Sequence, residues 1–445
     1  MDDEAFDNAK QIRFNLLATG EAAGGSRLSP LTGNRQNYYK NAEWSPDGTC
    51  IITNAADNHI RTFIIPPNLL EAREQPLKLE PYCTIPSLEP VNTLLGYPNF
   101  DLQDPSTALV LSTASEHPVR LNSALTGQLV ASYPLISPTT EAYIKPQSLL
   151  FAPDGSSFTA GSESLLSTFD LSRPGNGPLL SLKTGPKSSR ASWSNPGTSL
   201  RGLISALGVD PQYNVLAAGT LSRQVGLYDA AGHGECVGVF SVKGTEADLS
   251  ISGGGITQVC WSKCGKYLYI IERKSNGAMI YDIRNTGQLL SWITNRSATT
   301  NQRMKVELAV NPSTGHQDLW AGGVDGVMKM WEAPHLKEGS AEPTSLLKVH
   351  EAYSGKFGHY DPNNHKSSKP NAAGAIGRAE QLAEPDAPDQ TREKPQQTNE
   401  VTEAANADAE AESEDDLFPK AVGGAHPQPP RPEQPMRLLS GAERA

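Results

Sequence analysis

Long hydrophobic segments are absent from this 445-residue sequence, since no run of about eighteen apolar residues occurs in it. The chain begins with the acidic run Met1-Asp2-Asp3-Glu4, and no basic region with an apolar stretch behind it follows, as a signal peptide would require. We therefore expect a soluble protein that is neither secreted nor associated with a membrane.

Cysteine is scarce too, and the five residues are odd in number and include no Cys-x-x-Cys pair. This usage argues against a disulfide framework and a zinc ribbon, and it favours a reducing compartment, the cytosol or the nucleus. Cys260 and Cys264 flank a predicted turn with no histidine nearby, so Cys260 is interpreted as a buried strand residue and not as a zinc ligand. The five cysteines are Cys50, Cys83, Cys236, Cys260 and Cys264.

The familiar catalytic spacings are also missing. Gly265-Lys266 is followed by Tyr267, where a phosphate-binding loop needs Ser or Thr, and no Gly-x-Ser-x-Gly occurs. His350-Glu351 is not followed by the second histidine of a zinc-protease helix. We predict a non-enzymatic protein with no catalytic residue, no metal site, no cofactor and no small-molecule substrate.

The net charge of −11 is unevenly distributed along the chain. Residues 351–445 contain 17 acidic and 10 basic residues, whereas residues 1–350 contain 32 acidic and 28 basic residues. The body of the protein is thus nearly neutral, and any contact with a nucleic acid has to come from a local basic patch.

What the sequence does contain is a repeated β-strand pattern, rich in Gly and Pro. One unit has an apolar strand, a tight turn, a second strand, and a third strand that ends in an aromatic residue and an acid. In the first copy, residues 42–45 run into the turn Pro46-Asp47-Gly48, and strands at 50–53 and 60–64 follow. Turns recur near positions 46, 101, 153, 211, 264 and 313.

This spacing of about 50 residues slightly exceeds the roughly 40–45 residues of WD-repeat blades. Such units cannot bury their apolar faces singly, so they have to pack side by side in a ring. The pattern predicts an all-β fold, a WD-repeat β-propeller, with a two-sheet sandwich as the alternative. Trp44, Phe151, Val259 and Leu308 each lie in the apolar strand before a turn, and we expect their side chains in blade interfaces.

Six turns indicate six blades, and we expect seven, with an incomplete or irregular last blade. Residues 345–350 are predicted to begin that last blade, and residues 12–17 to donate a closing strand. After His350 the apolar pattern stops. The predicted organisation is an N-terminal segment over residues 1–36, the propeller over residues 37–350 and a disordered acidic tail over residues 351–445.

Two stretches of the propeller are basic. Residues 171–209 contain five basic residues, no acid and Trp193, and residues 273–305 contain six basic residues and the single acid Asp282. Arginine pairs with phosphates and an exposed tryptophan stacks on unpaired bases, so this composition is typical of single-stranded RNA recognition; a solvated loop is the alternative. The basic residues are Arg173, Lys183, Lys187, Arg190, Arg201, Arg273, Lys274, Arg284, Arg296, Arg303 and Lys305.

Several segments together resemble the telomerase Cajal body protein family. They are residues 44–54 (Trp-Ser-Pro-Asp-Gly-Thr-Cys-Ile-Ile-Thr-Asn) with Ala56-Asp57-Asn58, residues 125–129 with 131–133, Ser172-Arg173-Pro174-Gly175, and residues 299–303, Thr-Thr-Asn-Gln-Arg. The last is the most distinctive. The likeness covers about residues 37–335, whereas the final blade of the family is not found after His350 and the proline-rich N-terminal extension of animal members is absent.

The resemblance implies a nuclear WD-repeat platform that binds small nuclear RNA and assists ribonucleoprotein assembly or localisation, with small Cajal-body RNA, telomerase RNA or spliceosomal particles as RNA classes. It also implies ribonucleoprotein proteins as partners and folding by the cytosolic chaperonin, and the composition of the tails favours a fungal member. A general protein-interaction scaffold, such as a substrate adaptor of a ubiquitin ligase, is the alternative. The candidate RNA-binding residues are Arg303, Gln302, Asn301, Arg296, Lys187, Arg190 and Trp193.

Overall fold

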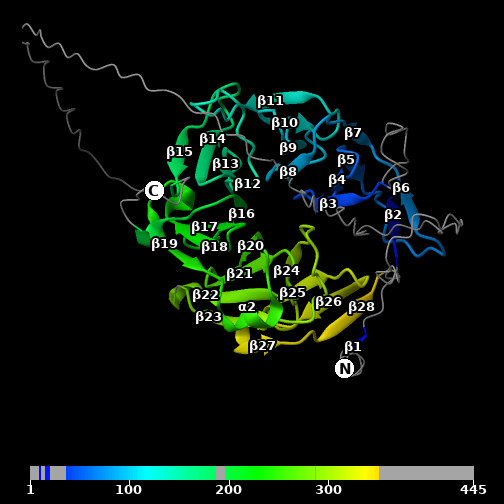
Figure 1. Ribbon diagram of the computed structural model, residues 1–445. Coiled ribbons are helices and arrows are strands. Elements are labelled where there is room, and N and C mark those ends of the chain that lie inside the picture. The colour runs from blue at the N-terminus through cyan, green and yellow to red at the C-terminus, as the bar shows by residue number, and fades with distance from the viewer. Residues whose placement is uncertain (1–9, 12–15, 21–36, 187–195, 286, 350–445) are drawn as a thin grey trace, which may run out of the picture. The chain divides into compact units, whose positions relative to one another are not determined.

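Six four-stranded antiparallel sheets follow one another along the chain and stand around a common axis (Figure 1). The computed structural model describes residues 10–11, 16–20, 37–186, 196–285 and 287–349, and these all lie in one unit, Met1–Ala383. A second unit, Glu384–Ala445, lies outside the described residues. The predicted β-propeller is confirmed, and within these described ranges helix is limited to α2 (Glu246–Ile251) and short 3-10 turns.

Each sheet forms one blade, and its strands are hydrogen-bonded in chain order from the axis outward. Blade 1 comprises β3 (Tyr39–Trp44), β4 (Cys50–Ala55), β5 (Ile60–Ile64) and β7 (Cys83–Ile85). Blade 2 comprises β8 (Val91–Gly96), β9 (Leu109–Ala114), β10 (Val119–Ser123) and β11 (Leu129–Tyr133). Blade 3 comprises β12 (Ser148–Phe151), β13 (Ser157–Ser162), β14 (Leu165–Asp170) and β15 (Leu180–Lys183).

The second half of the ring repeats this plan. Blade 4 comprises β16 (Ile204–Val209), β17 (Leu216–Thr220), β18 (Gln224–Tyr228) and β19 (Cys236–Ser241). Blade 5 comprises β20 (Ile256–Trp261), β21 (Tyr267–Glu272), β22 (Ala278–Asp282) and β23 (Leu289–Ile293), and a fifth strand, β27 (Gly339–Ala341), pairs with β23 in parallel. Blade 6 comprises β24 (Val306–Val310), β25 (Gln317–Gly322), β26 (Val327–Trp331) and β28 (Ser345–Lys348).

The turns between the first two strands of a blade follow from their sequences. In blade 1 the Gly48 amide donates to the Ser45 carbonyl at 2.9 Å, and the Asp47 carboxylate accepts from the Thr49 amide at 3.1 Å. Gly48 has φ +70°, a conformation that only glycine adopts without strain. Gly155 and Gly265 hold the same turn position in blades 3 and 5, with φ +72° and +66°. The glycine at this position therefore marks these three turns for a physical reason.

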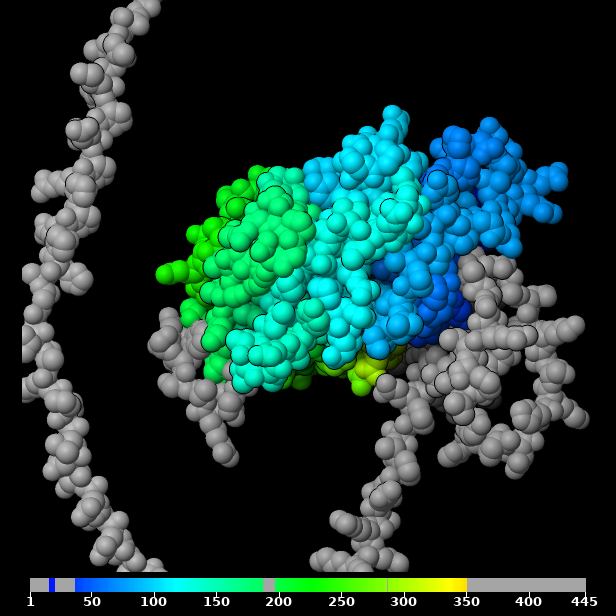
Figure 2. Space-filling model, turned by 90° about the horizontal axis from the view of Figure 1, so that it is seen from above, coloured from blue at the N-terminus to red at the C-terminus, as the bar shows by residue number. Residues whose placement is uncertain are grey.

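A hydrophobic core joins each of the first five blades to the next one. Phe151 and Val259 lie in two of these cores and Leu308 packs against a third, as predicted from their strands. In Figure 2 the outer surface runs in chain order from blue through cyan to green, since consecutive blades lie side by side. The cores thus hold the ring together between neighbours.

Trp44 differs from the prediction, because its side chain is 60% exposed. It lies on the face of blade 1 that points away from blade 2, and no hydrophobic core among the described residues joins this face to blade 6. In Figure 1 the yellow strands of blade 6 and the blue strands of blade 1 stand apart. No blade among the described residues packs against the indole ring, so most of it is exposed.

Part of that face of blade 1 is covered by a small two-stranded parallel sheet. It comprises β2 (Ala18–Gly20) and β6 (Leu77–Leu79). Ala18 and Leu79 pack with Ile51 and Phe63 of blade 1, which are buried as a result. The sheet lies at the outer part of the position where a seventh blade would stand.

The end of the ring also differs from the prediction. Residues 345–350 were expected to begin a last blade, but β28 pairs with β26 and completes blade 6. The described residues form six four-stranded blades, so a seventh is not confirmed. An N-terminal strand, β1 (Lys10–Gln11), pairs in parallel with β28, whereas most of the expected closing strand, residues 12–15, lies outside the described residues.

Candidate nucleic-acid interface

One face of the propeller carries several basic side chains that form no ion pair with a described residue. Two kinds of loop lie at this end of the blades, because the strands are antiparallel. They are the turns between the second and third strands of each blade and the connections that lead from one blade to the inner strand of the next. We call this end the connector face. In blades 3 to 6 the basic residues of this face that form no ion pair with a described residue include Arg201, Lys243, Arg273, Lys274 and Arg303.

Arg303 lies nearest the axis, on the connection that enters β24. Its Nη1 donates to the carbonyl oxygen of Gln147 at 3.0 Å, and its Nη2 lies 3.5 Å from the Gln147 side-chain oxygen. Gln147 directly precedes the inner strand of blade 3, so this contact crosses the axis from blade 6. Burial lowers the pKa of Arg303, and the nearby positive charge of Arg273 lowers it further. The side chain nevertheless remains accessible to solvent.

Arg296 has a different position, because only 1% of it is exposed. Its Nη2 donates to the Met304 carbonyl at 2.6 Å, and burial lowers its pKa to about 10. Arg296 therefore fixes the segment that carries Arg303, and an RNA strand has no access to it. On the same segment Asn301 is exposed and Gln302 is half-buried.

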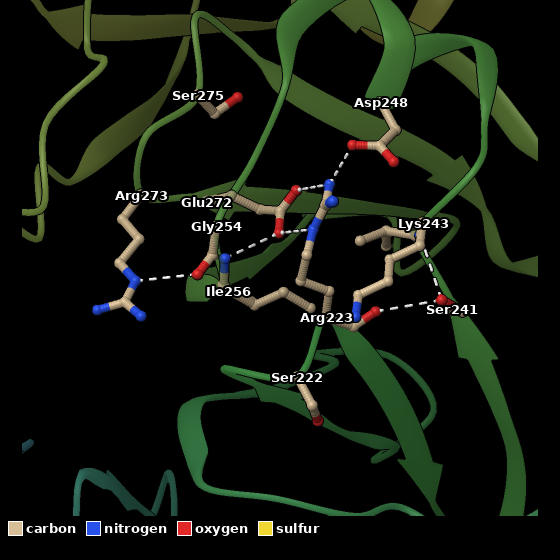
Figure 3. Close-up of polar contacts among 12 residues, drawn as sticks. Ser222, Arg223, Ser241, Lys243, Asp248, Gly254, Ile256, Glu272, Arg273 and Ser275 are labelled. Carbon is tan, nitrogen blue, oxygen red and sulfur yellow. Dashed lines mark hydrogen bonds and ion pairs between the residues drawn. The ribbon is translucent and has the colours of Figure 1, made fainter. Parts of the chain in front are cut away.

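Arg273 lies beside a buried ion-pair network that joins blades 4 and 5 (Figure 3). Within this network Arg223 donates from Nε and Nη2 to the two Glu272 oxygens at 2.7 Å, and from Nη2 to Asp248 at 2.5 Å. Arg223 is thus neutralised. Arg273 points away from the network, and its Nε donates to the Gly254 carbonyl at 3.0 Å, which leaves the rest of its guanidinium for a ligand.

A cavity of about 470 Å³ opens on the connector face between blades 3 and 4. Arg201 and Lys243 supply positive charge to its wall, and Glu163 is the one acid in its lining. Three serine hydroxyls and an amide add hydrogen-bonding groups, a lining that suits a phosphate and a ribose. The remaining lining residues are Ser164, Pro186, Gly202, Ser222, Gln224 and Ser241.

The other basic residues of the two stretches are scattered. Arg284 pairs with Asp282 at the opposite end of blade 5, and Arg173 follows β14 at that same end. Lys305 pairs with Glu43 and so links blade 6 to blade 1. Lys187, Arg190 and Trp193 lie outside the described residues, directly after Pro186 of the cavity wall.

Sequence reasoning missed Lys243 and Gln147. Lys243 lies outside both basic stretches, and only the return of the chain from β19 brings it beside Arg201. Gln147 is an ordinary polar residue whose importance comes from a contact 156 positions away. No local pattern in the sequence signals either residue.

Neither a metal centre nor a membrane span is found in the described part of the chain. No group of three or more His, Cys, Asp or Glu there is arranged to hold a metal ion. None of the helices in the same residues is long and apolar enough to cross a bilayer.

The blades, their glycine turns and the third strands that end in an aromatic residue and an acid define a WD-repeat β-propeller. This class of protein is generally a non-enzymatic binding scaffold. No family model matches the chain. Three similar proteins show which group of WD-repeat proteins it joins.

The chain is 31% identical over 309 residues to telomerase Cajal body protein 1 of Mesocricetus auratus, covering 68% of this chain and 52% of that protein. It is 30% identical over 314 residues to the Homo sapiens protein of that name, covering 69% and 52%. It is 27% identical over 341 residues to the guanine nucleotide-binding protein negative regulator 1 of Schizosaccharomyces pombe, covering 76% and 81%. The resemblance to the telomerase Cajal body protein family is thus confirmed over two thirds of this chain, and the chain spans about half the length of the animal relatives.

Proposed function

We propose that this protein is a WD-repeat scaffold whose connector face binds a single-stranded segment of a small nuclear RNA. The observation that carries the proposal is the set of five basic residues on one face that lack an acidic partner among the described residues. Arg223 and Arg284, by contrast, are each paired with acids. The names of the animal relatives add a link to telomerase and Cajal bodies for those proteins.

The proposed binding mode has two parts. Lys243 and Arg201 bind phosphate and ribose groups in the cavity between blades 3 and 4, and Arg273 and Arg303 bind the strand where it passes near the axis. Phosphate contacts supply affinity that falls with salt, whereas sequence selection needs base contacts. Trp193, outside the described residues, is our candidate for base stacking.

We further propose a nuclear site of action, with ribonucleoprotein proteins as partners and the cytosolic chaperonin as the folding assistant. A fungal origin and a role in either Cajal-body, telomerase or spliceosomal particles belong to the same proposal. These parts rest on the family resemblance and on the name of the animal relatives.

The test is RNA binding by purified full-length variants over a range of salt concentrations. We expect Arg273→Gln and Lys243→Gln each to weaken binding and to lower the salt slope by about 0.7, the value for one lost phosphate contact on a single strand. Arg173→Gln, at the opposite end of the blades, is the matched control and should leave both quantities unchanged. Equal losses for all three variants, or no affinity in the parent protein, would assign the scaffold to protein partners.

Arg303 needs a second measurement, because it also joins blade 6 to blade 3. Arg303→Ala should lower RNA affinity by about 1–3 kcal/mol with little change in melting temperature if the contact with RNA is direct. Arg303→Lys should also impair binding, because a point charge replaces a planar fork. A lower melting temperature with normal RNA binding by the folded fraction would make Arg303 a structural link only.

A further inference from the structure

A short hairpin stands on the connector face, in the connection that leads from β11 to the inner strand of blade 3, and it spans residues 135–144. The amide of Ser137 donates to the carbonyl of Ala142 at 2.9 Å, and the amide of Ile144 donates to the carbonyl of Leu135 at 2.7 Å. Leu135 is buried in the core between blades 2 and 3, and Ile144 packs against the same core. This side of the hairpin therefore anchors it to the ring.

The opposite side of the hairpin is apolar and exposed. Ile136 and Tyr143 form the residue pair between the two hydrogen-bonded pairs. Because side chains alternate along a strand, these two point away from the core that Leu135 and Ile144 contact. The side chains of a pair without hydrogen bonds lie close together, and here Ile136 is 49% exposed and Tyr143 is 40% exposed. The hairpin thus presents an apolar pair that the core does not use.

The position of Tyr143 differs from that of the other strongly exposed aromatic residues. Within the part of the chain that the structure describes, the aromatic side chains exposed by 40% or more are Trp44, Tyr82, Tyr143 and Tyr213. Trp44 ends an inner strand, Tyr82 precedes an outer strand, and Tyr213 lies in the turn between the first two strands of blade 4. These three positions belong to the opposite end of the blades. Tyr143 alone of the four lies on the connector face.

The segment after Tyr143 leads to the unpaired cations of this face. Lys145 forms no ion pair with a described residue, and the carbonyl of Gln147 accepts from Arg303 at 3.0 Å. Tyr143 and Gln147 are four residues apart, so their backbones are separated by about 14 Å at most. The one acid from residue 135 to residue 147 is Glu141, which balances the charge of Lys145. The hairpin is therefore nearly neutral and suits a base better than a phosphate.

We propose that Tyr143, with Ile136 beside it, stacks on an unpaired base of the RNA strand whose phosphates the cations of the connector face bind. An aromatic ring can stack on any base, because every base has a π-face. The inference rests on the proposed function and adds to it a base contact in the described part of the chain. Stacking also favours a single strand over a duplex, since the bases of a duplex are already stacked on one another.

The test is the binding of two single-stranded probes by the purified full-length protein. One probe is an oligouridylate of about 12 nucleotides, and the other is the abasic ribose-phosphate oligomer of the same length. We expect Tyr143→Ala to weaken oligouridylate binding about five- to a hundredfold and to leave binding of the abasic oligomer unchanged, because only a base can stack. The salt slope should stay that of the parent protein, since no phosphate contact is lost.

Two further variants are controls. Tyr143→Phe keeps the aromatic ring and should bind both probes as the parent protein does. Tyr213→Ala removes an exposed ring at the opposite end of the blades and should change neither affinity. Leu135 and Ile144 keep the hairpin anchored in Tyr143→Ala, so its melting temperature should match that of the parent protein.

The outcomes separate this inference from the proposed function. Unchanged oligouridylate binding by Tyr143→Ala, together with a loss for Arg273→Gln, overturns the stacking role of Tyr143 and leaves the proposed function standing. Equal losses for the two probes also overturn that role, because the hairpin then acts through the phosphate contacts. If the parent protein binds neither probe, the proposed function fails and the stacking role fails with it.

Discussion

Arg223→Met tests the ion-pair network that joins blades 4 and 5. The substitution removes three hydrogen bonds and leaves Glu272, 2% exposed, without its cation. The remaining hydrogen bond to this carboxylate that the structure shows comes from the Gly255 amide at 3.3 Å. Breaking a buried pair from one side costs about 3–5 kcal/mol, so we expect a loss of that size in the free energy of unfolding.

The double variant Arg223→Met with Glu272→Met should recover most of the loss. Removing both charges leaves no uncompensated buried ion, and Asp248 is close enough to solvent to remain hydrated. Arg284→Met is the matched control, because Arg284 is 60% exposed beside Asp282 and its removal should cost less than about 1 kcal/mol.

Urea unfolding of the four proteins measures these differences through the midpoint and the slope. The pH dependence of the free energy of unfolding is a second measurement. Burial by itself raises the pKa of Asp248, but the hydrogen bond from Arg223 outweighs it and holds the pKa below its ordinary value. The resulting stability is present above the unfolded pKa and is lost as the pH falls through the lower folded one. A cost below about 1 kcal/mol for Arg223→Met, or a double variant as unstable as the sum of its parts, would refute the reasoning.

Two further predictions concern blades 5 and 1. Gly277→Ala places a Cβ atom 1.9 Å from the Ile293 carbonyl oxygen, so thermal unfolding should show a loss of about 3 kcal/mol or more, whereas Gly238→Ala meets no atom within 4 Å and should be nearly neutral. Asp57→Asn should flatten the fall in melting temperature below about pH 4. Burial by itself raises the pKa of Asp57, but the hydrogen bond from Arg61 outweighs it and lowers the pKa, so the contribution of this pair to stability is lost on acidification. An unchanged acid profile would contradict this.

The blades were predictable because their signals are local. The turn at Pro153-Asp154-Gly155 needs a residue with positive φ, and Phe158 and Phe169 alternate toward one core, so the sequence around them carries the strand pattern. The same rule misplaced Trp44. The side chains of its strand alternate between the two faces of blade 1 as predicted. Whether another blade covers the face that carries Trp44 depends on residues far away in the sequence.

The residues of the proposed interface were only partly predictable for a related reason. Basic composition identified Arg273 and Arg303, and it selected Arg296 equally, although Arg296 is buried. Charge in a sequence does not distinguish a cation that meets solvent from one that holds a loop. The parallel pairing of β2 with β6 joins segments far apart in the chain, and neither has a pattern that specifies the other.

The detour of the chain between β26 and β28 affects how the propeller comes apart. Before completing blade 6, it crosses to blade 5, where Pro334 accepts from the Ser291 hydroxyl at 2.9 Å, His335 lies 3.0 Å from the Tyr269 hydroxyl, and β27 extends the sheet. A terminal repeat with one neighbour is ordinarily the first to fray. Here blade 6 cannot unfold without separating β27 from β23 of blade 5. We therefore expect the amides of the two blades to exchange hydrogen together and the two blades to unfold as one cooperative unit.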